Sequence, residues 1–293
     1  MDTQLATKTT RAGRPALLMT LRQRLTMPAA VADLMGWLSA IALVTFILLP
    51  LVAIVAVSLA KATYWHFPPQ SFTFAWYERL LANSEFRRSL FVSLGTAALV
   101  GIFGTALGLL ASLGIARGRH NSGEGLATIA LLPLLFPTVA LGVAIYTFYL
   151  RVRLPINIGT LALAQLVLVL PFTIRLLTVA LNGLNPNLEK AALNLGASPR
   201  RTVISVTLPQ ISMSITAAVI FGFIRSFDDA GIALFVNDPK TITVPVRLLF
   251  FLDTQSGPLI AAGSSILLIV GLLVVLIVSA TIGLERAYGV KKN

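Results

Sequence analysis

The 293-residue sequence contains no cysteine and only two histidines, His66 and His120. The absence of cysteine excludes disulfide bonds, thiolate catalysis and cysteine-ligated metal sites. Two histidines far apart in the sequence provide no metal-ligand cluster. Charged residues make up 12% of the chain, whereas soluble domains contain about 25%. Hydrophobic residues make up 56% and the mean hydropathy is +0.86, so the composition indicates a membrane protein.

Six apolar stretches are each long enough to cross a bilayer as a helix, which takes about 20 residues. They cover residues 36–60, 89–116, 126–150, 158–182, 211–235 and 259–284. We therefore predict an all-α polytopic membrane bundle of six transmembrane helices. The predicted parts are a cytoplasmic basic tail (1–35), a first transmembrane helix with its outer loop (36–88), a helical core (89–284) and a second cytoplasmic tail (285–293).

The net charge of +12 has two possible meanings. In a soluble protein it would suggest a nucleic-acid partner, but in a membrane protein such an excess usually lies in loops that face anionic lipid. We therefore expect a lipid bilayer and no nucleic acid as partner. With the N-terminus inside, 13 of the 23 Lys and Arg residues fall in inside segments. The positive-inside rule then slightly favours cytoplasmic placement of both termini.

Prolines and glycines interrupt the apolar stretches. Pro133 and Pro137 in the third stretch, and Pro171 in the fourth, predict kinks because each removes a backbone hydrogen bond. Gly104 and Gly108 in the second stretch are spaced like small residues that allow two helices to approach closely. Both features are compatible with a transporter and with ordinary packing.

The loop between the fourth and fifth stretches carries the most specific pattern. Asn185 followed by Pro186 is typical of a helix N-terminus, and Gly196 of a left-handed helix stop. Ser198 then caps a second helix that begins at Pro199. The loop is therefore predicted to be a short helix, a glycine turn and another helix, presented on one face of the membrane for a partner.

This loop resembles the cytoplasmic loop of binding-protein-dependent ABC importer permeases, whose pattern is Glu-Ala-Ala, three residues, Gly, nine residues and Ile-x-Leu-Pro. Here Lys190 stands where the family usually has glutamate, and Glu189 lies one residue earlier. A shift of one residue rotates the carboxylate by about 100° around the helix. The residues that the resemblance assigns to an ATPase-coupling loop at 183–210 are Glu189, Lys190, Ala191, Ala192, Gly196, Ala197, Ser198, Leu208 and Pro209.

The resemblance implies a type I ABC importer (MetI-like) permease fold in a bacterial cytoplasmic membrane. The implied partners are a cytosolic ABC ATPase dimer, a second permease subunit in a heterodimer, and a periplasmic or extracellular substrate-binding protein. ATP and Mg would bind to the ATPase. None of the six lysines follows a glycine, so the chain has no Gly-Lys-Ser/Thr phosphate-binding loop. We therefore expect a transport subunit that is not an enzyme and binds no cofactor.

The end of the fifth stretch suggests the solute. Within the family, the run Arg225-Ser226-Phe227-Asp228-Asp229 most resembles spermidine/putrescine permeases. A charge in the bilayer costs roughly 2.5–3.5 kcal/mol, so the aspartates should face the bundle interior or a wet cavity. Carboxylates beside Phe227 would suit a polyamine cation. Alternatively, Arg225 forms a structural ion pair with one aspartate, since both lie within helical reach.

Other solutes and two other classes of membrane protein are alternatives to this interpretation. The solute could instead be an amino acid derivative, an opine or a phosphonate. A gradient-driven secondary transporter usually shows internal repeats, and no convincing repeat relates the first three stretches to the last three. An intramembrane enzyme would need a nucleophile with a base or a metal cluster, and the apolar stretches contain no such set.

Overall fold

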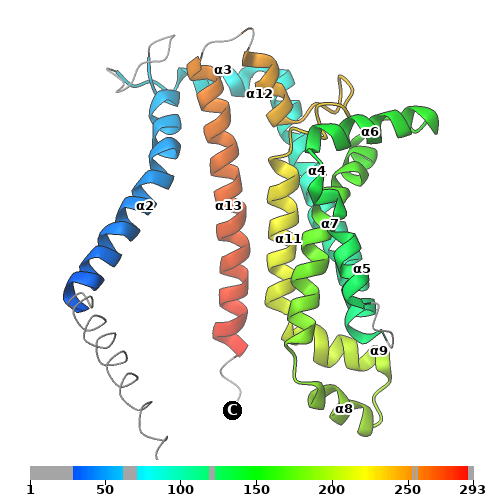
Figure 1. Cartoon of the computed structure of the whole chain (residues 1–293). Helices are drawn as coiled ribbons and strands as arrows, with labels where there is room; N and C mark the ends of the chain where they lie inside the picture. The colour runs from blue at the N-terminus through cyan, green and yellow to red at the C-terminus, as the bar shows by residue number, and fades with distance from the viewer. Residues whose placement is uncertain (1–28, 62–70, 119–122, 253, 255–256, 290–293) are drawn as a thin grey trace, which may run out of the picture. The chain divides into compact units, whose positions relative to one another are not determined.

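The computed structural model describes residues 29–61, 71–118, 123–252, 254 and 257–289 (Figure 1). Most of the predicted basic tail, both histidines and residues 290–293 lie outside the described residues. The chain divides into two units, Met1–Ala53 and Ile54–Asn293.

The first unit contains most of the helix α2 (Ala29–Ser58). Its stretch Asp33–Ser58 has 26 residues and a mean hydropathy of 3.0. Large apolar side chains are exposed from Leu34 to Val52. A helix that is apolar on every side is stable only inside lipid or protein, so α2 has the character of a membrane span.

In the described residues of the second unit, helices joined by turns and loops make up the regular structure, apart from an isolated β-bridge between Ala60 and Phe72. Its elements are α3 (Ala75–Ala82), α4 (Ser84–Arg117), α5 (Gly123–Ala130), the 3-10 helix η1 (Leu132–Leu135), α6 (Thr138–Arg151), α7 (Ile158–Asn182), α8 (Pro186–Asn194), α9 (Pro199–Thr202), the π-helix η2 (Val203–Thr207), α10 (Leu208–Gln210), α11 (Ser212–Phe227), α12 (Val244–Leu252) and α13 (Gly257–Gly289). We call the end of this unit that carries α8 to α10 the coupling end, and the end that carries α3, α6 and α12 the opposite end (Figure 1).

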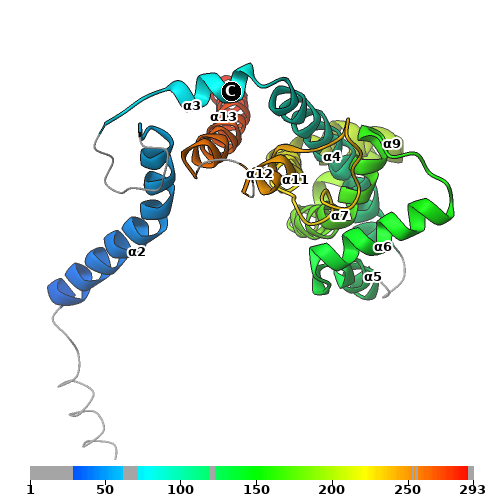
Figure 2. The same cartoon turned by 90° about the horizontal axis from the view of Figure 1, so that it is seen from above.

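The helices α4, α7 and α11 form the centre of the second unit, where each packs on the other two (Figures 1 and 2). Glycines set the distance between α4 and α11. A Cβ atom on Gly101 would lie 2.9 Å from the carbonyl oxygen of Val219, and a Cβ atom on Gly222 would lie 3.1 Å from the Cα of Gly101. The two backbones are therefore in direct contact, which only residues without a side chain permit.

The predicted close approach at Gly104 and Gly108 is confirmed, and the partner helix is α7. A Cβ atom on Gly104 would lie 3.0 Å from a methyl carbon of Val169, and one on Gly108 would overlap the side chain of Thr173. The hydroxyl of Ser112, one turn further on, donates to the carbonyl of residue 174 in α7 at 2.9 Å. This polar contact joins the two helices where no side-chain volume separates them.

The third predicted stretch is not one straight helix. It is divided into α5, η1 and α6, and Pro133 lies inside η1 while Pro137 precedes α6. The predicted kinks there are confirmed, and they are sharp enough to turn α6 away from the direction of α4 and α7 (Figures 1 and 2). With 14 residues, α6 is about 21 Å long, which is too short to cross a bilayer core of about 30 Å.

The predicted count of six spanning helices is not confirmed. In the described residues, four single helices are long and apolar enough to cross a membrane. A fifth span results if two consecutive segments that meet at 73°, Pro199–Gln210 and Ser212–Phe227, are counted as one. The fifth stretch also ends earlier than predicted. Its helix α11 ends at Phe227, and residues 231–235 form turns that the side chain of Asp229 stabilises by accepting the N–H of Ala233 at 3.1 Å.

Candidate functional site

The coupling loop at 183–210 has the predicted local structure. Asn185 caps α8 by accepting the N–H of Asn187 at 3.0 Å, and Pro186 is the first helical residue. Ser198 caps α9 by accepting the N–H of Arg201 at 3.3 Å. Each cap satisfies a backbone N–H that a helix N-terminus leaves without a partner.

Gly196 ends α8 with a φ of +86°, the left-handed conformation that favours glycine. The N–H of Ala197 donates to the carbonyl of Ala192 at 3.1 Å, and the N–H of Gly196 donates to the carbonyl of Leu193 at 3.0 Å. This pair of hydrogen bonds is the Schellman motif. It fixes the angle between α8 and α9, so the loop is a rigid projection and not a flexible linker.

The carboxylate of Glu189 faces the permease itself. It forms an ion pair with Arg117 at the end of α4 and accepts a hydrogen bond from the hydroxyl of Thr207 at 2.7 Å. Arg117 also donates to the hydroxyl of Thr207 at 2.8 Å. Arg117, Glu189 and Thr207 thus form one cluster that joins α4, α8 and the π-helix η2, and we call it the anchor cluster. Its carboxylate and guanidinium side chains are 27% and 34% exposed, so solvent weakens the ion pair.

The other residues assigned to the coupling loop are mostly turned outward. Lys190 and Ala191 are exposed on α8, and Pro209 is exposed in α10. A hollow of about 240 Å³ lies beside the anchor cluster, lined by Ala116, Arg117, Leu181, Asn182, Leu184, Pro186 and Glu189. The chain from α9 then bends into α11 just after Pro209, where the direction changes by 73°.

The acidic pair after α11 separates into one buried and one exposed aspartate. Asp229 is 2% exposed. Its Oδ2 accepts the amide N–H of Gln165 from α7 at 3.1 Å, and its Oδ1 lies 3.9 Å from a guanidinium nitrogen of Arg225. The hydroxyl of Ser226 donates to the side-chain oxygen of the same Gln165 at 2.5 Å. Asp229 therefore belongs to a polar network between α7 and α11, and it also forms the ion pair with Arg225 that the structural alternative described.

Asp228 is exposed, and its carboxylate has no ion pair within the part of the chain that the structure describes. Phe227, by contrast, is 4% exposed and stacks on Phe223 with the ring centroids 5.6 Å apart. Its ring packs inside the bundle and not on an open surface beside the aspartates. Of the four residues assigned to a substrate pathway, Asp228 is the one whose charge is both exposed and uncompensated.

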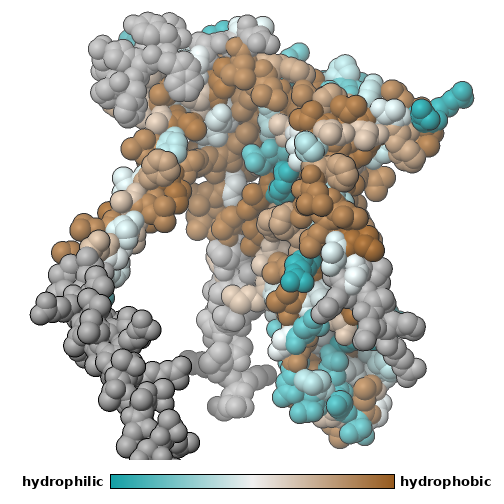
Figure 3. Space-filling model, viewed as in Figure 1, coloured by the Kyte–Doolittle hydropathy of each residue, from teal (hydrophilic) through white to brown (hydrophobic). Residues whose placement is uncertain are grey.

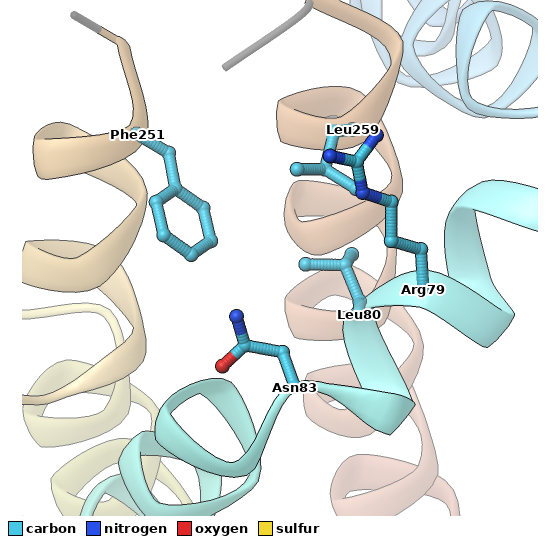
Figure 4. A pocket seen from close by; sticks show the side chains of 5 residues that line it. All are labelled: Arg79, Leu80, Asn83, Phe251 and Leu259. Carbon is cyan, nitrogen blue, oxygen red and sulfur yellow. The ribbon is translucent and has the colours of Figure 1, made fainter. Parts of the chain in front are cut away.

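The opposite end of the unit has a smaller hollow of about 100 Å³ between α3, α12 and α13 (Figure 4). It is lined by Arg79, Leu80, Asn83, Phe251 and Leu259. Ligand pockets usually measure about 300–1,000 Å³, so this hollow is too small to be a solute site. Nearby, Arg247 of α12 pairs with Glu85 of α4 at 3.0 Å and holds the two helices together.

Sequence reasoning missed three polar partners of the assigned residues. Arg117 and Thr207 contact Glu189, and Gln165 contacts Asp229. The last could have been suspected, since an amide is unusual inside an apolar span and needs a hydrogen-bond partner there. In the described residues, no group of three or more His, Cys, Asp or Glu side chains could hold a metal ion.

The fold and these sites define a polytopic membrane permease with a rigid helical projection at one end. Residues 104–285 match the family model of binding-protein-dependent transport system inner membrane components, and the chain belongs to this family. It is a subunit of an ABC importer, a multi-pass inner-membrane protein and not an enzyme. This result decides against the secondary transporter and the intramembrane enzyme.

The similar proteins include polyamine permeases. The chain is 23% identical over 235 residues to the spermidine/putrescine transport system permease protein PotC of Haemophilus influenzae, covering 79% of this chain and 90% of that protein. It is 27% identical over 223 residues to the putrescine transport system permease protein PotI of Escherichia coli, covering 73% of this chain and 77% of that protein. A solved bacterial ABC transporter involved in alginate import has a chain of the same fold, with a TM-score of 0.67 and 16% identity. The match covers 91% of this chain and 98% of that chain.

Proposed function

We propose that this permease forms half of an ATP-driven translocation pathway for a polyamine-type organic cation. The other half is a second, non-identical permease subunit. An ABC ATPase dimer, which binds ATP and Mg, docks on the coupling loop, and a periplasmic or extracellular binding protein delivers the solute. The coupling end and both termini then face the cytoplasm.

The observation that carries the coupling role is the rigid α8–Gly196–α9 projection. Both of its helices are capped, its turn is closed by two backbone hydrogen bonds, and the anchor cluster ties it to α4. A rigid connection of this kind can transmit the movement of a docked ATPase to the centre of the bundle. A loosely attached loop could not do so.

Co-purification of the whole importer tests the coupling role. Replacing Gly196 by Val forces a β-branched residue into the left-handed region, so we expect the ATPase subunit to be lost. The matched control is Gly196→Asn, because asparagine tolerates that region and should retain the ATPase. Retention of the ATPase by Gly196→Val, with normal uptake, would contradict the assignment of this loop.

The polyamine assignment is supported by the names of the similar permeases and by Asp228. An exposed carboxylate without a compensating charge attracts cations, and a polyamine carries several positive charges along an apolar chain. Because Arg225 compensates Asp229, only one of the two acids is available for a passing cation.

Uptake of labelled putrescine and spermidine into vesicles that contain the complete importer tests this assignment. We expect Asp228→Asn to lower uptake about 10- to 150-fold while the ATPase remains bound, since one hydrogen bond to a charged group is worth roughly 1.5–3 kcal/mol. Asp238→Asn is a control, because that acid contacts residues 240 and 241 within its own turn. Normal polyamine uptake by Asp228→Asn would remove the substrate role.

A further inference from the structure

The charges of the coupling loop are distributed unequally between its inner and outer sides. Between residues 185 and 210 the charged residues are Glu189, Lys190, Arg200 and Arg201. Glu189 is the single acid, and the anchor cluster holds its carboxylate against the permease. Lys190, Arg200 and Arg201 are all exposed. The charges that the loop presents to a partner are therefore exclusively positive.

The position of Lys190 follows from helix geometry. Successive residues of an α-helix point about 100° apart, so a helix that turns Glu189 toward α4 must turn its neighbour away from the bundle. The ion pair and the hydrogen bond to Thr207 fix this rotation of α8. The outward position of Lys190 is thus a consequence of the inward carboxylate.

Exposed apolar side chains accompany the positive charges. Leu188 in α8 and Leu195, the residue that follows the helix, are both exposed, and Leu195 is 89% exposed. Figure 3 shows that the surface of the coupling end is otherwise mainly polar. Exposed leucines within a rigid, polar projection are typical of a protein–protein contact.

Resting on the proposed coupling role, we propose that the outer face of α8 and α9 is received by an ATPase groove with an apolar floor and carboxylates on its rim. Leu188 and Leu195 fill the floor. Lys190 pairs with one carboxylate, and Arg200 and Arg201 with others. Complementary charge of this kind selects the matching ATPase and speeds its association more than it adds affinity. It would therefore distinguish this importer's ATPase from those whose groove carries positive charge.

Anionic lipid is the alternative occupant of a basic surface next to a membrane. Attraction to lipid headgroups requires positive charge but no fixed geometry. The capped helices, the closed turn and the anchor cluster hold the charges in one arrangement, together with exposed leucines. These features favour a shaped protein groove.

The test uses the complete importer in nanodiscs and measures binding of the ATPase subunit as a function of salt. For the unmodified permease, we expect affinity to fall as salt increases. Lys190→Glu should weaken binding roughly tenfold or more at low salt, and a lysine in place of the facing ATPase carboxylate should restore it. Arg151→Glu, the same charge reversal at the opposite end, is the matched control and should bind the ATPase normally.

Each outcome has a defined meaning. If Lys190→Glu binds the ATPase as tightly as the unmodified permease, the acidic groove is wrong while the coupling role stands. If the effect of Lys190→Glu disappears in nanodiscs of neutral lipid, the surface faces the membrane and the proposal is overturned. If the unmodified permease retains no ATPase at any salt concentration, the proposed function itself fails.

Discussion

At the residue scale, adjacent side chains of this protein have opposite environments. Asp229 is enclosed in a hydrogen-bonded network, whereas Asp228 next to it is exposed. In the same way, Glu189 is held by Arg117 while Lys190 is exposed. Neighbouring residues on a helix or tight turn point in different directions, so a single step in the sequence separates a side chain held in a polar network from an exposed one.

Removing the buried carboxylate should destabilise the protein. In Asp229→Ala, the amide of Gln165 and the N–H of Ala233 lose their acceptor, at a cost of about 1–3 kcal/mol for each unsatisfied group. Asp229→Asn keeps an acceptor oxygen and should cost less. Thermal unfolding of the purified complex measures both variants. An unfolding temperature of Asp229→Ala equal to that of the unmodified protein would show that the network contributes nothing.

The anchor cluster should hold α8 in place. Glu189→Gln removes the ion pair with Arg117, and Thr207→Val removes the hydroxyl between the two charged groups. We expect either change to speed hydrogen exchange in α8, and a double-mutant cycle to give a coupling energy of about 0.5–1 kcal/mol, because the charged side chains are partly exposed. Lys190→Gln, which leaves the cluster intact, should exchange normally. Equal exchange in all three variants would mean that the cluster does not restrain α8.

At the element scale, backbone contact between helices determines the centre of the bundle. Gly101 and Gly222 bring α4 against α11, and Gly104 and Gly108 bring it against α7. Other glycines of α4, such as Gly114, have open space where a side chain would lie. The helix therefore contains glycines of two kinds, and the sequence pattern alone does not distinguish them.

This difference predicts opposite effects for the same substitution in one helix. Gly101→Ala places a methyl group 2.9 Å from a backbone oxygen of α11 and should destabilise the bundle by about 1–3 kcal/mol. Gly114→Ala meets nothing and should be neutral or stabilise by up to about 1 kcal/mol, since alanine favours the helix. Thermal unfolding compares the two. If Gly101→Ala is as stable as Gly114→Ala, the helices do not cross in close contact there.

At the scale of the whole molecule, the second unit carries its polar projection at one end and short helices at the other. Apolar side chains are widely exposed on the long helices, which requires lipid or partner subunits around them. The sidedness of the protein in the membrane follows if the projection meets a cytosolic ATPase.

Labelling of single cysteines tests this sidedness, and the natural absence of cysteine makes the chain suitable for it. Asn187→Cys lies in α8 at the coupling end, and Arg151→Cys ends α6 at the opposite end. In intact spheroplasts, an impermeant maleimide should label Arg151→Cys at once and Asn187→Cys only after permeabilisation. The reverse order would place the coupling end outside and contradict the proposed topology.

The amino-acid sequence by itself determined the membrane class, the apolar helices and the capped helices around Gly196. These features depend on hydropathy and on local backbone preferences, which act within a few residues. It also indicated breaks at Pro133 and Pro137, but not that α6 would turn aside or that α11 would end at Phe227.

Only the tertiary structure decided what each charge does. Glu189 meets Arg117 across 72 residues of sequence, and Asp229 meets Gln165 across 64. Such pairs form because α4, α7 and α11 pack at distances that their glycines allow, and no local rule contains that information. Because charged residues are scarce in this chain, the few in the apolar stretches and in the loop at 183–210 were the candidate sites. Packing decided that Glu189 and Asp229 hold the structure together, and that Lys190 and Asp228 remain exposed.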